Sequence, residues 1–101
     1  MSDDKAIKGV EVEIAGEKAA ALGRSGRKLR TALDKLQSFD ERVRRHARSA
    51  DPVARAKLVK VAADAFWAYV VQREVMGLVD ADYIRREYRV PHEVWRRGSP
   101  R

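Results

Sequence analysis

Residues 11–48 read EVEIAGEKAAALGRSGRKLRTALDKLQSFDERVRRHAR, and this stretch decides the fold. Small or apolar residues recur along it, and just before it, at steps of three, four and seven: Ile7, Val10, Ile14, Ala21, Ser25, Leu29, Ala32, Leu36, Phe39 and Val43. Such steps place side chains on one face of an α-helix. The phase continues through Gly23-Arg24-Ser25-Gly26, where a loop would normally reset it. The pattern therefore predicts one long helix over residues 11–48.

Two features of the same stretch favour a different interpretation. Gly16, Gly23 and Gly26 lie inside it, and each Gly costs about 1 kcal/mol relative to Ala in a helix interior. Residues 10–14 alternate Val-Glu-Val-Glu-Ile, a pattern typical of a strand. A split into two helices at residues 23–26 is therefore the alternative to one continuous helix.

The second half of the chain begins with a strong helix-start signal. Asp51 can cap a helix whose first residue is Pro52, because proline lacks the N–H that a first turn leaves unpaired. This predicts a helix over residues 52–76 with Gly77 as its C-cap. The helix is apolar nearly all round, which is typical of helices buried on several sides.

The C-terminal quarter is expected to form two short helices. Asp80 can cap a helix over residues 81–88, and Val90-Pro91 then ends it. Pro91 can open a last turn over residues 91–97, while residues 98–101 are expected to fray.

The helix lengths predict an all-α fold, a long helical hairpin plus short C-terminal helices, in a single domain over residues 1–97. The first helix would be about 57 Å long and the second about 38 Å, at about 1.5 Å per residue. About 20 Å of apolar seam between Ile7 and Leu22 would then lack a partner within the chain. We therefore expect a homodimer in which two hairpins complete a four-helix bundle.

Composition narrows the classes of protein that the chain could belong to. It has 101 residues and no Cys, which excludes a disulfide scaffold, a Cys-ligated zinc site, an iron–sulfur cluster and thiol catalysis. No apolar run approaches the ~20 residues of a membrane span, and the acidic start Met1-Ser2-Asp3-Asp4 is not that of a signal peptide. We therefore expect a cytoplasmic protein with no membrane partner.

The net charge of +7 is concentrated in one segment. Residues 1–23 carry a net charge of −2, whereas residues 24–48 carry +6. Within that segment a basic stripe follows one flank of the long helix: Arg24, Arg27, Lys28, Lys35, Arg42 and Arg45. Basic side chains at helical spacing can follow a phosphate backbone, so nucleic acid is a candidate partner. The alternative is a set of solvated charges, since the stripe has no aromatic residue for base stacking.

Residues that could carry catalysis are sparse. The only imidazoles are His46, which lies in a basic run, and His92, and they do not form a metal-binding spacing. None of the Ser or Thr residues lies in a Gly-x-Ser-x-Gly motif, and Gly23-Arg24-Ser25-Gly26 is too short for a phosphate-binding loop. The sequence therefore predicts no enzymatic activity, no catalytic residue, no metal site and no cofactor.

One polar cluster interrupts the apolar second helix. Arg73 projects near its core face, where an unpaired charge would be costly. One interpretation is a structural ion pair with an acidic residue such as Asp80, Asp82 or Glu87. The other is a polar pocket for an anionic ligand, formed by Trp67, Tyr69, Gln72, Arg73 and Tyr83.

Several segments resemble a group of known proteins. They are residues 17–24 (EKAAALGR), residues 67–74 (WAYVVQRE), Gly77-Leu78, Tyr88 and residues 90–94 (VPHEV). Together they resemble small uncharacterised bacterial all-helical proteins of a domain-of-unknown-function type. The resemblance implies a small helical bacterial protein without an assigned activity.

These observations lead to one functional hypothesis and two alternatives. We expect a small homodimeric structural or interaction protein without catalytic activity. The first alternative is a nucleic-acid-associated protein that uses the basic stripe, and the second is a bundle that binds an anionic ligand through Arg73.

Overall fold

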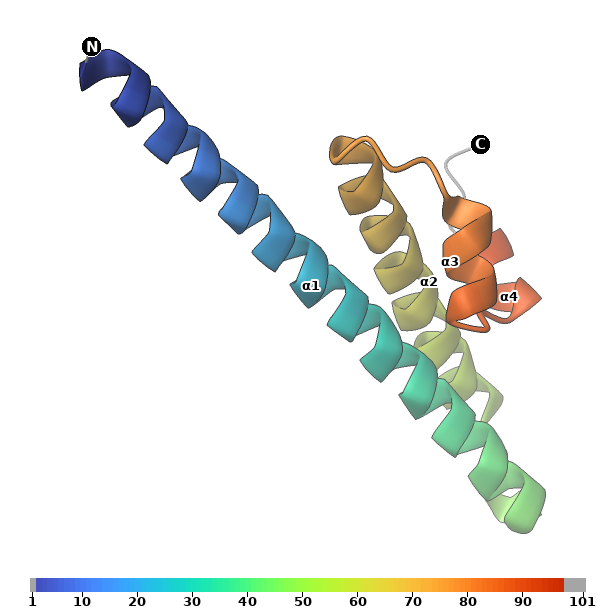
Figure 1. Cartoon of the computed structure of the whole chain (residues 1–101). Coiled ribbons are helices and arrows are strands. Elements are labelled where there is room, and N and C mark those ends of the chain that lie inside the picture. Colours follow the sequence, from blue (N-terminus) through green and yellow to red (C-terminus); the bar gives the residue numbers. More distant parts are fainter. Residues whose placement is uncertain (1, 98–101) are drawn as a thin grey trace.

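The computed structural model describes residues 2–97, with side chains from residue 9 onward except Ser49. The elements are α1 (Ser2–Arg45), the short 3₁₀ turn η1 (Ala47–Ser49), α2 (Pro52–Val75), α3 (Ala81–Glu87) and α4 (His92–Arg96). The part of the chain that the structure describes is predominantly helical and contains no strand. The expected all-α fold, with a long hairpin and short C-terminal helices, is confirmed (Figure 1).

The first helix differs from its expected bounds at both ends. α1 begins at Ser2 rather than at residue 11 and ends at Arg45 rather than at residue 48. Acidic residues 3 and 4 favour a helix start there, because they complement the positive end of the helix dipole. At the other end, residues 46–51 reverse the chain direction before α2, and His46 already has an extended backbone.

The alternative of two helices split at residues 23–26 is wrong, because α1 is continuous there. Gly26 is buried, and a Cβ on it would lie 3.2 Å from the Tyr88 hydroxyl and 3.3 Å from the Tyr69 ring. The missing side chain therefore allows two aromatic rings to approach the α1 backbone closely. This packing offsets the cost of glycine in a helix interior.

The core lies where α2 runs antiparallel to the C-terminal half of α1 (Figure 1). Leu29 from α1 and Phe66 from α2 are almost completely buried, as are Ile84 from α3 and Val94 from α4. α3 and α4 therefore cover one side of the hairpin. On the other side, α1 and α2 alone line a groove.

The N-terminal part of α1 extends beyond the core as an unpartnered rod (Figure 1). Every described side chain from residue 9 to residue 20 is exposed, a segment that we call the overhang. Val10 is 54% exposed and Ile14 47%, whereas Leu22 packs against the core. The sequence expectation of an apolar seam without a partner in the chain is thus met for Val10 and Ile14, while the side chain of Ile7 lies outside the described residues.

The caps of α2 follow the sequence signals closely. Asp51 accepts hydrogen bonds from the backbone N–H groups of Val53 (3.0 Å) and Ala54 (3.2 Å), and Pro52 is the first helical residue. Met76 is the C-cap, and Gly77 follows it with φ +83°. Gly77 was expected to be the C-cap but instead occupies the position one residue after it. There it adopts the left-handed conformation of a Schellman motif.

The two short helices lie within a residue of their expected bounds, but their caps differ. Asp80 precedes α3 without capping it, because its carboxylate binds Arg73 instead. α3 ends in a second Schellman motif, with the Val90 N–H donating to the Arg85 carbonyl (2.9 Å) and Arg89 at φ +51°. Pro91 is the N-cap of α4 rather than its first residue, and the expected frayed tail, residues 98–101, lies outside the described part.

The left-handed residues at these two helix ends predict that introducing a glycine stabilises the fold and that removing a glycine destabilises it. Arg89→Gly should stabilise the protein by about 1 kcal/mol, because glycine adopts a positive φ without the clash that a Cβ causes. Gly77→Ala should destabilise it by about as much, for the same reason. Urea unfolding followed by circular dichroism measures both changes, and a destabilised Arg89→Gly variant would contradict this account.

Candidate functional site

The six residues of the basic stripe all lie on α1 and are exposed. In the part of the chain that the structure describes, none of the six forms an ion pair within 4 Å. Neighbouring arginines off the stripe differ in this respect, since Arg30 pairs with Asp34 at 3.5 Å and Arg44 with Glu41 at 3.8 Å. The stripe therefore presents positive charge that the described part of the chain does not neutralise by direct pairing.

Four of the six stripe residues border the groove on the uncovered side of the hairpin. We call this the open groove, and its volume is about 630 Å³. Its α1 wall includes Arg24, Arg27, Lys28, Thr31 and Lys35, and its α2 wall includes Val61, Asp64, Ala65 and Ala68. The groove thus has a floor of small apolar side chains and a cationic edge. An amphipathic segment that carries negative charge would match both properties.

The polar pocket expected around Arg73 is largely occupied by the chain itself. Arg73 forms a two-pronged ion pair with Asp80, in which Nε donates to Oδ1 at 2.9 Å and Nη2 donates to Oδ2. A weaker third contact runs from Nη1 to the Tyr69 hydroxyl at 3.5 Å. The Arg73 guanidinium lowers the pKa of the Asp80 carboxyl by hydrogen bonding to its charged form. The structure therefore favours the interpretation of Arg73 as a structural ion pair that ties the end of α2 to the start of α3.

The other side chains of that predicted pocket differ in what they contact and in how exposed they are. Trp67 faces α4, where its indole Nε1 donates to the carbonyls of Trp95 and Arg97, both at 3.1 Å. Tyr83 is about half exposed and Gln72 is partly buried. Among the proposed members of the pocket, Tyr69 is the one that offers Arg73 a hydrogen bond and a cation–π contact.

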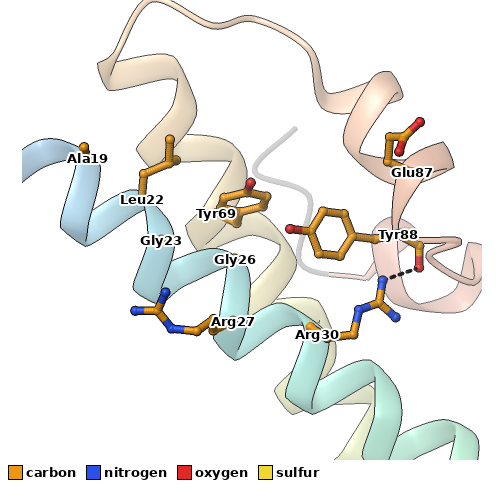
Figure 2. A pocket seen from close by; sticks show the side chains of 9 residues that line it. All are labelled: Ala19, Leu22, Gly23, Gly26, Arg27, Arg30, Tyr69, Glu87 and Tyr88. Carbon is orange, nitrogen blue, oxygen red and sulfur yellow. Dashed lines mark hydrogen bonds between the residues drawn. The ribbon is translucent and has the colours of Figure 1, made fainter.

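A hollow of about 630 Å³ lies beside α1, and sequence reasoning missed it. Figure 2 shows the side chains that line it. The rings of Tyr69 and Tyr88 meet edge to face over Gly26, with 5.6 Å between their centroids. Arg30 donates to the Tyr88 carbonyl at 3.4 Å, and its guanidinium lies over the Tyr88 ring. Burial raises the pKa of the Tyr88 hydroxyl, so it stays neutral. Gly26, next to the apolar seam, was the one signal in the sequence, since only a small residue permits such an approach.

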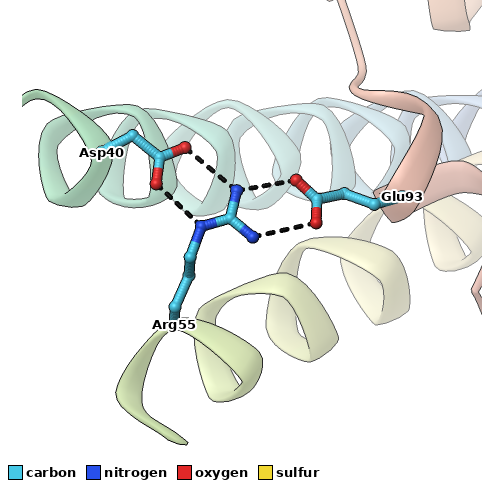
Figure 3. A network of polar contacts seen from close by, with 3 residues as sticks. All are labelled: Asp40, Arg55 and Glu93. Atoms are coloured by element: carbon cyan, nitrogen blue, oxygen red, sulfur yellow. Dashed lines mark hydrogen bonds and ion pairs between the residues drawn. The ribbon is translucent and has the colours of Figure 1, made fainter. Parts of the chain in front are cut away.

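A second polar cluster joins three helices (Figure 3). Arg55 of α2 donates through Nε to Asp40 of α1 at 2.8 Å, and through Nη2 to Glu93 of α4 at 2.7 Å. Two further hydrogen bonds make each pairing two-pronged. Helical spacing alone would favour the i,i+4 pairs Asp40–Arg44 and Glu41–Arg45. In the structure Asp40 pairs instead with Arg55, and Glu41 pairs with Arg44. The cluster holds α4 against the hairpin.

Comparison with known proteins gives no matching family model, and no curated protein or solved structure matches significantly. The resemblance to small uncharacterised bacterial proteins therefore stays a prediction. Among residues 9–97, no three His, Asp or Glu side chains come together as a metal ion would need. No helix of the described part is long and apolar enough to cross a membrane.

The Arg55 cluster predicts a stability that depends on pH. Hydrogen bonds from Arg55 lower the pKa of both Asp40 and Glu93 in the folded protein. Because these pKa values are lower in the folded than in the unfolded chain, the cluster stabilises the fold above about pH 4. That stabilisation is lost as the pH falls through the folded-state values.

Arg55→Met should therefore cost about 1 kcal/mol at pH 7, a modest value because the carboxylates are partly exposed. The difference from the parent protein should shrink at pH 3. Urea unfolding at the two pH values measures it, with Lys60→Met as a control that breaks only the exposed pair with Asp64. An equal cost of Arg55→Met at both pH values would refute the assignment.

Proposed function

We propose that this chain is a small helical interaction protein that works as a homodimer and has no catalytic activity of its own. The observation that carries the proposal is the overhang. A helix about 66 Å long at 1.5 Å per residue packs against a partner of about 36 Å, and the surplus bears exposed apolar residues. A bacterial cytoplasmic location is part of the proposal, and a Cys-free composition supports the cytoplasm because small secreted domains are often disulfide-rich.

Exposed apolar surface on a long rod favours association. Val10 and Ile14 lie one turn apart on the same face of the overhang, and each is about half exposed. The outer face of α2 adds Val61, Val71 and Val75, also about half exposed or more. Covering such patches is favourable by roughly 25 cal/mol per Å² of apolar surface removed from water. Two copies related by a two-fold axis would cover both patches at once.

The proposal predicts that a charge placed in the overhang disrupts the dimer without disturbing the fold. Ile14→Asp should raise the dimer dissociation constant on the order of tenfold or more, because it buries an unpaired carboxylate at the interface. Sedimentation equilibrium measures the constant. Val79→Asp is the matched control, since Val79 is 86% exposed and lies in the loop between α2 and α3. A parent protein that stays monomeric at a concentration of about 100 μM would overturn the proposal.

A second candidate function is binding of a nucleic-acid backbone. It is favoured by one observation, namely that the six stripe residues are exposed and that none forms an ion pair among the described residues. Binding through several phosphates would make the association constant fall steeply with salt.

This candidate has its own test. Fluorescence anisotropy with a labelled 20-nucleotide duplex at rising salt should give a slope of several phosphates, and Arg24→Ala with Lys28→Ala should reduce it by about two. Arg96→Ala with Arg86→Ala is the control, because these arginines lie on α4 and α3. If the protein fails to bind the duplex at low salt, this candidate function is eliminated.

A further inference from the structure

We infer that the overhang of one copy lies in the open groove of a second copy, antiparallel to its α1. The inference rests on the homodimer proposed above and names the two surfaces that meet. Both surfaces belong to this chain, and their shapes, polarity and charges are complementary.

The overhang and the stripe occupy one continuous face of α1. Ile14, Ala21, Lys28 and Lys35 succeed each other at steps of seven, so they share that face. Up to Ala21 the face combines apolar residues with the carboxylate of Glu17, and it becomes basic from Arg24 onward. Since α2 covers the neighbouring face only from Leu22 onward, the apolar part has no partner in its own chain.

The overhang and the open groove carry opposite charges. The overhang carries three exposed carboxylates, Glu11, Glu13 and Glu17, and one cation, Lys18. The open groove presents four basic residues, and Asp64 is the one acidic residue that lines it. An antiparallel arrangement brings the acidic segment of each copy onto the basic segment of the other. A parallel arrangement would place like charges against each other, which is costly across an interface.

The α1 helices of the two copies can also be aligned in a specific register. A two-fold axis that passes between Ala21 and Arg24 pairs residues at equal distances from it. Glu17, four residues before Ala21, then faces Lys28 of the second copy, four residues after Arg24. Ile14, seven residues before Ala21, likewise faces Thr31 of the second copy. Glu17, Ala21, Arg24 and Lys28 are spaced by four, three and four, as one helix face requires.

The groove offers the apolar contact that this register needs. Thr31 lines it together with Val61 and Ala65 of α2, so Ile14 of the incoming overhang would rest on small apolar side chains. Val61 is 55% exposed in the single chain and would be covered. Each overhang would thus become the third helix beside an α1–α2 pair, and two copies would form an antiparallel bundle of four long helices.

Charge reversal with rescue tests the pairing in the full-length chain. Glu13→Lys with Glu17→Lys, or separately Arg24→Glu with Lys28→Glu, should each raise the dimer dissociation constant on the order of tenfold. Combining the four substitutions should restore it to within about threefold of the parent value, because the attraction returns with its signs exchanged. Glu74→Lys with Glu87→Lys is the matched control, since both side chains are exposed and lie outside the overhang and the groove.

Disulfide trapping tests the register independently, because the chain has no cysteine of its own. Ile14→Cys and Thr31→Cys proteins, mixed in a glutathione redox buffer, should give mainly the mixed dimer on a non-reducing gel. Circular dichroism should show unchanged helix content in every variant.

Each outcome decides a separate point. A dimeric parent whose charge-reversed forms behave like the control, or in which Ile14→Cys pairs mainly with itself, would overturn the antiparallel pairing while leaving the homodimer intact. A monomeric parent would overturn both.

Discussion

The packing of α1 against α2 around Leu29 and Phe66 is the contact on which the rest of the structure depends. Both side chains are almost completely buried, and full burial of such a side chain contributes about 1.5–3 kcal/mol. Gly26 extends this contact by letting Tyr69 and Tyr88 approach the α1 backbone. Because the two helices differ so much in length, the same contact leaves the overhang without a partner in its own chain.

Two arginine clusters join the short C-terminal helices to this hairpin. Arg55 links α1, α2 and α4 through Asp40 and Glu93, and Arg73 links the end of α2 to Asp80. Burial of apolar residues stabilises the packing of the short helices on the hairpin, because Ile84 and Val94 lie in the same core as Phe66. The ion pairs fix where the short helices lie. They therefore confine α3 and α4 to one side of the hairpin and leave the other side as the open groove.

The functional proposals follow from this asymmetry. One side of the hairpin is covered by its own chain, while the other combines an apolar floor with a row of cations that form no ion pair among the described residues. A complementary surface exists in the acidic and apolar overhang of the same chain. Self-association uses both features together, whereas binding of nucleic acid uses the cations alone, and for this reason the homodimer is the preferred proposal.

The sequence by itself determined the helices and the seam between them. Periodic apolar residues from Val10 to Val43 predicted a continuous α1, and Asp51-Pro52 and Gly77 marked the ends of α2, because these signals depend on local backbone chemistry. The stripe was also readable, since exposed charges at helical spacing need no tertiary contact. Only the tertiary structure decided which partners the half-buried polar groups take. For Arg73 the sequence offered three acidic candidates, and the fold selected Asp80. Asp40 binds Arg55 rather than Arg44, because a distant segment offered a two-pronged partner that local spacing cannot reveal.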